Sequence, residues 1–138
     1  MTKVPCSPLE KTSGMVYFAR MLEKIRLFAA GELREDLHAH LGKYMDAWCS
    51  QFLRIDYAVL KERTLAGGSN EEILEWCFAN GRPLNDVDIT IWNGFVTKIG
   101  WNDNASARLA AVKEAAGLQH RTDIQTMAAF IDADEGRA

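Results

Sequence analysis

Three carboxylates stand near the end of the chain, in a place where local electrostatics disfavours them. Asp132, Asp134 and Glu135 follow directly on a segment whose apolar residues have helical spacing. The carbonyl end of a helix carries partial negative charge, so each carboxylate there costs about 0.3–1 kcal/mol, whereas a lysine would stabilise the helix. Such carboxylates are expected to have cationic partners. The first predicted helix offers two, because Arg20 and Lys24 lie one turn apart on the same side.

Three explanations of this acidic end stay open. In the first, the helix ends near Ile131 and residues 132–138 form a solvated acidic tail. In the second, the carboxylates pair with Arg20 and Lys24 and clamp the C-terminal end onto the first helix. In the third, they hold a cation or a basic ligand, and the segment is part of a binding site.

The tryptophans divide into two groups by their surroundings. Trp48, Trp76 and Trp92 each lie in an apolar pattern, and we expect them to fill the core, where large aromatic area contributes strongly to stability. Trp101 stands beside a glycine in a predicted turn, which suits a residue that lines a pocket or a contact surface. With the charged groups it completes the set of candidate ligand-binding residues: Arg20, Lys24, Trp101, Asp123, Asp132, Asp134 and Glu135.

His38 and His40 are the weak candidates for a metal site. Side chains two positions apart point to different sides of a helix and cannot share an ion there. In an extended loop both imidazoles would be able to face one side, with Asp36 as a third ligand. No further strong ligand stands nearby, since His120 lies far along the chain. We therefore predict no metal site and no cofactor.

Helix-boundary signals are the clearest pattern in the sequence, and they predict an all-α domain of six or seven short helices. Capping residues, glycines and apolar periodicity mark the starts and ends. Gly81 is expected to end one helix in the left-handed conformation. Residues 1–13 are expected to form an N-terminal arm or a short helical turn, and residues 1–138 a single domain. The predicted helices span residues 15–30, 44–52, 56–66, 69–80, 85–99 and 103–117, with a last one after a capping box of Thr122 and Gln125.

Residues 87–91 fit either a strand or a helix. Val87, Ile89 and Ile91 alternate with polar residues, as in a strand. However, Asn85 is a good helix cap, and the apolar series continues beyond Ile89 at helical spacing. No partner strand is evident elsewhere in the sequence, so a helix is the favoured prediction.

Composition and charge narrow the classes of function. The chain has 138 residues, of which 48% are hydrophobic and 25% charged, as in an ordinary globular domain. The net charge is −3 and no long basic run is present, so we do not expect nucleic-acid binding. Neither a signal peptide nor a membrane-spanning stretch is recognisable, and the expected location is the cytoplasm. The three cysteines are an odd number without metal-type spacing and predict neither a disulfide framework nor a zinc site.

Two stretches of the sequence resemble an uncharacterised bacterial family, the domain of unknown function 5069. The first is residues 16–27, with the sequence VYFARMLEKIRL. The second is more specific and joins residues 117–126, GLQHRTDIQT, to residues 131–137, IDADEGR. The resemblance spans nearly the whole chain, because the middle is also similar at Trp76-Cys77, Ile91-Trp92-Asn93 and Gly100-Trp101.

The chain departs from that family at two places. Glu23 stands where the family usually has aspartate, and residues 127–129 replace aromatic and acidic residues. The second departure weakens the idea that a carboxylate at that point is indispensable. The resemblance implies a helical bacterial protein and brings with it no substrate, cofactor or catalytic residue.

The motifs of common enzyme classes are missing from the sequence: there is no nucleophile elbow, phosphate-binding loop, dinucleotide glycine pattern or HExxH helix. The leading hypothesis is therefore a binding or interaction module without catalysis, with a homo-oligomer as one form and no identified partner. The alternative is a small-molecule or metal-dependent enzyme with a pocket near Arg20, Trp101 and the carboxylates of residues 132–135. A cleft where Arg20 and these carboxylates converge, with room for a ligand, would favour the enzyme. Direct pairing of Arg20 with the carboxylates in a filled interior would favour the binding module.

Overall fold

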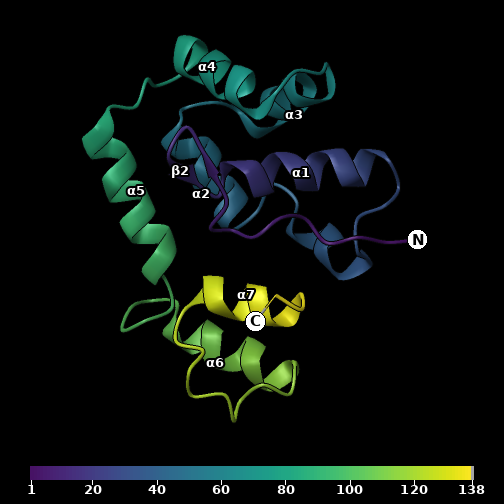
Figure 1. The fold of residues 1–138 in the computed structure, drawn as a ribbon, viewed down its shortest axis with the longest axis vertical. Coiled ribbons are helices and arrows are strands. Elements are labelled where there is room, and N and C mark those ends of the chain that lie inside the picture. Colours follow the sequence, from purple (N-terminus) through teal and green to yellow (C-terminus); the bar gives the residue numbers. More distant parts are fainter. Residues whose placement is uncertain (138) are drawn as a thin grey trace.

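The structure is a computed structural model that describes residues 1–137 (Figure 1). The predicted all-α class is confirmed, with 56% of the residues in helices. The elements within the described residues are β1 Lys11–Thr12, β2 Met15–Val16, α1 Phe18–Ala29, the 3₁₀ helix η1 Glu35–His40, α2 Met45–Phe52, α3 Tyr57–Leu65, α4 Asn70–Asn80, α5 Asp86–Lys98, α6 Ser106–Ala115 and α7 Met127–Asp134.

A short β-hairpin precedes α1, where the sequence predicts the first turn of a helix. Ser13 (φ 49°) and Gly14 (φ 85°) both have left-handed backbone conformations, which reverse the chain. The reversal pairs Lys11 with Val16 and Thr12 with Met15 in antiparallel register. The prediction of a helix from Met15 is therefore wrong by three residues, because the apolar pattern of Met15 and Val16 also suits a buried strand.

Helix caps set the starts of three helices, as the sequence predicts. The Asp56 carboxylate accepts hydrogen bonds from the first backbone amides of α3. Ser69 with Glu72 forms a complete capping box at α4, and Asn85 with Asp88 forms another at α5. A capping box satisfies two otherwise unpaired amides within one turn. The ambiguous residues 87–91 are thus helical, as the favoured prediction has it.

The start of the last helix is a correction. Residues Thr122 to Gln125 are expected to form its capping box, but α7 begins at Met127 and its cap is the Thr126 hydroxyl. Tertiary contacts hold the preceding segment in turns: the Lys113 Nζ donates to the backbone oxygens of Arg121 (2.7 Å) and Ile124 (3.0 Å). These contacts come from α6, so local sequence did not reveal them.

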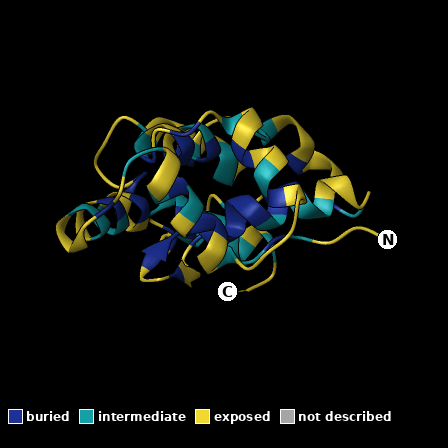
Figure 2. Cartoon of the chain, turned by 90° about the horizontal axis from the view of Figure 1, so that it is seen from above, coloured by how far each residue is buried: buried dark blue, intermediate teal, exposed yellow. Residues whose placement is uncertain are grey.

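The helices form two parts connected by α5. In Figure 1, α1 lies in the middle, the pair α3–α4 lies above it and the pair α6–α7 below it, while α5 runs along one side. The principal buried cluster draws on β2 and α1–α5, for example Phe18, Leu60 and Trp92. Buried residues gather in the interior, and the outer faces of the helices are exposed (Figure 2). Ile99, Leu109, Ile124 and Ala128 are buried outside that cluster, so the α6–α7 pair has a small core of its own.

None of the described helices is both long enough and apolar enough to cross a membrane.

Gly81 ends α4 for a different reason from the one its sequence position suggests. Its φ is −131°, which is not left-handed, so the expected left-handed cap is wrong. A Cβ atom at Gly81 would lie 2.3 Å from the Leu53 carbonyl oxygen and 2.7 Å from Ile55 Cδ1. The absence of a side chain here permits close packing between the end of α4 and the end of α2.

Alanine at Gly81 should therefore destabilise the protein, whereas alanine at Gly94 should stabilise it. We expect Gly81→Ala to lower the free energy of unfolding by about 1–3 kcal/mol or more through overpacking. In the interior of α5, a Cβ at Gly94 meets nothing within 4 Å, and Gly94→Ala should raise that free energy by about 1 kcal/mol. Urea unfolding of both variants measures the difference. Equal effects at the two positions would contradict the packing argument.

Candidate functional site

Three arginines neutralise the acidic end of the chain. Arg20 makes a two-pronged ion pair with Glu135, with Nη1–Oε1 at 2.8 Å and Nη2–Oε2 at 2.7 Å. The two side chains are only 3% and 2% exposed. Arg34 pairs with Asp134 at 2.7 Å, and Arg137 pairs with Asp132 at 2.8 Å and also with Glu135. This is the clamp among the three explanations, with Arg20 as its centre.

The solvated-tail explanation is wrong, because α7 does not end near Ile131. The helix continues to Asp134 and closes with Gly136 (φ 85°), whose amide donates to the Ala133 oxygen. The Arg137 amide donates to the Asp132 oxygen, which completes a Schellman end. The carboxylates at the carbonyl end of α7 are tolerated because cations from α1 and from the segment before η1 approach them.

Lys24 does not take part in the clamp; it belongs to a second buried cluster around Asp46. The Asp46 carboxylate is 0% exposed and accepts bonds from Tyr17 Oη (2.5 Å), Lys24 Nζ (3.0 Å) and the Gly42 amide (3.0 Å). Burial and the neighbouring Asp46 charge raise the pKa of the Tyr17 hydroxyl well above its usual value. Burial lowers the pKa of Lys24, and the Asp46 charge opposes that change. The cluster fixes the start of α2 against α1.

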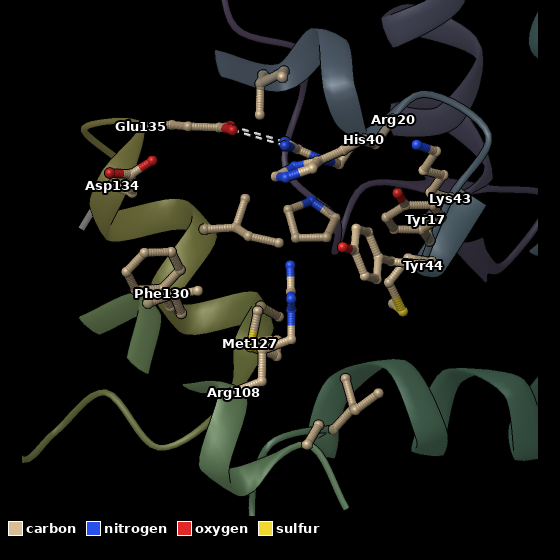
Figure 3. Close-up of a pocket in the computed structure, with 18 of the residues that line it drawn as sticks. Tyr17, Arg20, His40, Lys43, Tyr44, Arg108, Met127, Phe130, Asp134 and Glu135 are labelled. Carbon is tan, nitrogen blue, oxygen red and sulfur yellow. Dashed lines mark hydrogen bonds and ion pairs between the residues drawn. The ribbon is translucent and has the colours of Figure 1, made fainter. Parts of the chain in front are cut away.

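A cavity of ≈ 400 Å³ opens between these two ion-paired clusters and the α6–α7 pair. Figure 3 shows Tyr17, Lys43, Tyr44 and His40 on one side, Met127 and Phe130 from α7 on the other, and the Arg20–Glu135 pair spanning one edge. Its lining residues come mainly from α1, η1, α2, α6, α7 and the segments next to them. They are Pro8, Tyr17, Arg20, Lys24, Asp36, Leu37, His40, Lys43, Tyr44, Met45, Trp48, Ile99, Ala105, Arg108, Val112, Ala115, Ala116, Met127, Ala128, Phe130, Ile131, Asp134 and Glu135.

Tyr44 lines this cavity from a strained backbone position. The turn from Lys43 to Asp46 is closed by a 3.1 Å backbone bond, and Tyr44 in it has φ 54° and ψ −119°. Glycine normally takes this position of a type II′ turn. A side chain there costs about 1–3 kcal/mol. The strain places the Tyr44 ring between His40, whose ring centroid is 5.5 Å away, and the Arg108 guanidinium, 4.1 Å from the ring.

The structure brings together four of the seven candidate ligand-binding residues at the cavity. They are Arg20, Lys24, Asp134 and Glu135. The other three lie elsewhere. Trp101 is 53% exposed and outside the cavity lining, and Asp123 pairs with its neighbour Arg121 on the surface. Asp132 is tied to Arg137 and, at 3.1 Å, to the Ser7 hydroxyl.

His38 and His40 do not converge. His38 Nε2 lies 2.8 Å from the Leu33 carbonyl oxygen, and its ring packs edge-on against Phe28. His40 instead faces Tyr44 in the cavity. Within residues 1–137, no group of three or more histidine, cysteine, aspartate or glutamate side chains is placed to hold a metal ion.

Sequence reasoning missed the residues that give the cavity its polar wall, Tyr17, Lys43, Tyr44 and Arg108, and the buried Asp46 behind them. Gly42, which directly precedes Lys43 and Tyr44, indicates a turn in the sequence, but it does not indicate which side chains of that turn face the cavity. Arg108 stands in an alanine-rich helix with no signal of its own. Trp48 is a further correction, because it is 41% exposed and lines the cavity instead of filling the core.

Comparison with known proteins identifies a family. A model of the domain of unknown function 5069 (DUF5069) matches residues 2–137. The chain belongs to this family. The match includes both stretches of the sequence that resemble it, and the DUF5069 description assigns no activity. No curated protein matches the chain.

Removal of Arg20 should break the clamp. We expect Arg20→Ala to lower the free energy of unfolding by about 3 kcal/mol, because Glu135 then stays buried with only Arg137 as a partner. Limited proteolysis should cut near the C-terminal end sooner. The matched control is Arg34→Ala, which removes a more exposed pair and should cost about 0–1 kcal/mol. A small effect of both substitutions would show that the buried pair does not hold the C-terminal part.

Substitutions of Tyr44 should reveal the backbone strain through an inverted preference. Tyr44→Gly should be more stable than Tyr44→Ala by about 1 kcal/mol or more, since only glycine takes this conformation freely. At Lys61, an exposed residue in the interior of α3, the alanine variant should instead be more stable than the glycine variant by about 1 kcal/mol. Chemical unfolding of the four variants gives both differences. If the alanine variant is the more stable one at both positions, the backbone of Tyr44 is not strained.

Proposed function

We propose that this protein binds a small molecule in the cavity between its N-terminal part and the α6–α7 pair. The cavity of ≈ 400 Å³ is the observation that carries the proposal. Small-molecule sites usually have volumes of roughly 300–1,000 Å³ and combine an apolar lining with a few convergent polar groups. Here Met127, Phe130 and Ile131 supply apolar surface, and Tyr44 and Arg108 are among the polar groups.

The fixed position of the cavity wall supports this proposal. Arg20 with Glu135 and Lys24 with Asp46 are buried ion pairs, and Arg20, Lys24 and Glu135 line the cavity. Side chains held in this way do not have to be ordered when a ligand arrives, which lowers the entropic cost of binding.

Backbone strain at the cavity supports the same proposal. Tyr17 has φ 75° and Tyr44 has φ 54°, and both residues line the cavity. Strained non-glycine residues cluster at ligand sites, where the surrounding structure holds them in place. Each of the two also begins a helix, Tyr17 before α1 and Tyr44 before α2. Two such positions at one cavity favour a site that depends on the placement of these side chains.

A catalytic role is the second candidate, and the Asp46 cluster is the observation that favours it. Tyr17, whose pKa is raised, and Lys24, whose pKa is lowered, lie together at the cavity wall. Titratable groups with perturbed pKa values in a cavity are typical of acid–base sites. Mass spectrometry of each bound compound after incubation separates the candidates, because an enzyme changes its ligand and a binding protein returns it unaltered.

The remaining sequence-based expectations stay predictions. They are a bacterial origin, a cytoplasmic location and the absence of a cofactor and of a nucleic-acid partner; a homo-oligomer stays one of the possible forms.

A bulky side chain in the cavity should abolish ligand binding. Screening a metabolite library by thermal shift should find compounds that raise the melting temperature, because binding to the native state stabilises it. Ala115→Trp places an indole at the cavity lining, and these compounds should no longer stabilise that variant. The control is Ala110→Trp, an exposed alanine of the same helix outside the lining, which should keep the response. Identical shifts in both variants would place the ligand elsewhere.

A further inference from the structure

Most charged groups at the cavity already have partners. Arg20 pairs with Glu135, and Lys24 pairs with Asp46. The other two carboxylates of the lining, Asp36 and Asp134, both pair with Arg34. Each lining carboxylate thus has a cationic partner within the protein, although Asp36 and Asp134 share the single guanidinium of Arg34.

Two cations of the lining have no such partner. Lys43 and Arg108 both line the cavity, and neither side chain makes an ion pair or a hydrogen bond within residues 1–137. Exposed cations on a protein surface are commonly solvated and need no explanation. These two differ because they line one cavity from different parts of the chain, Lys43 from the segment before α2 and Arg108 from α6.

Arg108 is an exposed residue, but an aromatic ring holds its guanidinium in place. Its guanidinium lies 4.1 Å from the centre of the Tyr44 ring, and Figure 3 shows the side chain extending from α6 into the cavity. Stacking on an aromatic face leaves the N–H edge of the guanidinium free to donate. The strained Tyr44 backbone keeps the ring where this contact forms. The donors of Arg108 are thus directed and unoccupied.

His40 lies beside Arg108 in the cavity, because both pack against the Tyr44 ring. Burial lowers the pKa of His40, and the charges of Lys24 and Arg108 lower it further, against the opposing effect of Asp36 and Asp46. The charge of Arg108 therefore acts on the groups that line the cavity.

Apolar side chains line the cavity next to Arg108. Met127, Phe130 and Ile131 come from α7, and Val112 and Ala116 belong to α6 or its end. A ligand that matches this lining has a charged head and an apolar body.

We propose that the ligand of this cavity is an organic anion, whose carboxylate or phosphate group is bound by Lys43 and Arg108 and whose apolar part packs against α6 and α7. This inference rests on the proposed function and names its class of ligand. Arginine suits both groups, because its planar edge can donate two parallel hydrogen bonds to a carboxylate or a phosphate. His40 and the Tyr44 ring form the side of the anion subsite.

Four small probes test the inference on the full chain. Benzoate and phenyl phosphate carry the two anionic groups on one aromatic ring, benzyl alcohol is a neutral analogue, and inorganic phosphate lacks the apolar part. Titrations followed by NMR, with the indole signal of Trp48 in the cavity wall as a local reporter, give the dissociation constants. The better of the two organic anions identifies which head group the site prefers.

Arg108→Gln and Lys43→Gln are the decisive variants. Each should weaken binding of the preferred organic anion about tenfold or more, as expected for the loss of a charged hydrogen-bond donor. Binding of benzyl alcohol should not change. Lys61→Gln, an exposed lysine of α3 outside the cavity, is the matched control and should leave every dissociation constant unaltered. Added salt should weaken the binding of the anions and leave the binding of benzyl alcohol unchanged.

Three outcomes would overturn the inference. If benzyl alcohol binds as tightly as the anions, and neither Arg108→Gln nor Lys43→Gln changes a dissociation constant, the cavity is a binding site but not for an anion. If inorganic phosphate binds as tightly as phenyl phosphate, the apolar wall contributes nothing and the ligand is not organic. If no probe binds, and no library compound distinguishes Ala115→Trp from Ala110→Trp, the proposed function itself fails.

Discussion

The ion pair between Arg20 and Glu135 is the constraint on which the rest of the structure depends. It joins α1, in the middle of the N-terminal part, to the end of α7. The principal apolar cluster does not include α6 or α7, so apolar packing alone does not determine how that pair lies against α1. Polar contacts at the C-terminal end, with the buried Arg20–Glu135 pair at their centre, therefore help to fix how the two parts lie, and the cavity is directly beside them.

Burial of charge makes this constraint specific. A buried ion pair contributes little net stability compared with apolar residues of the same size, but leaving one partner alone is strongly unfavourable. Arg20 also donates to the Cys6 carbonyl at 3.1 Å, and Glu135 also accepts from Arg137. An alternative docking of α7 would leave these groups unpaired in a dry interior, whereas apolar side chains would tolerate it. The charges thus select one arrangement of the two parts.

The cavity combines this rigidity with local strain. Tyr44 occupies a turn position that suits glycine, and its ring contacts Arg108 from the other part of the chain. A substitution that relieves the strain would also remove the surface on which the guanidinium stacks. Stability and ligand binding are therefore expected to oppose each other at this residue, as they often do at functional sites.

Sequence alone determined the elements whose causes are local. Asp56, Ser69 with Glu72, and Asn85 with Asp88 begin helices through hydrogen bonds that span a few residues, and each was readable without a structure. The unfavourable charges near the C-terminal end were also readable from the sequence, but it left a solvated tail, a clamp and a ligand site as open explanations. Only the tertiary structure decided three other features. They are the identity of the cations that approach this end, the late start of α7, and the presence of Lys43 and Arg108 at one cavity. The physical reason is the distance along the chain over which each interaction acts. A cap satisfies amides of its own helical turn. An ion pair or a cavity wall joins side chains from segments far apart in the sequence, and no local sequence pattern shows that they meet.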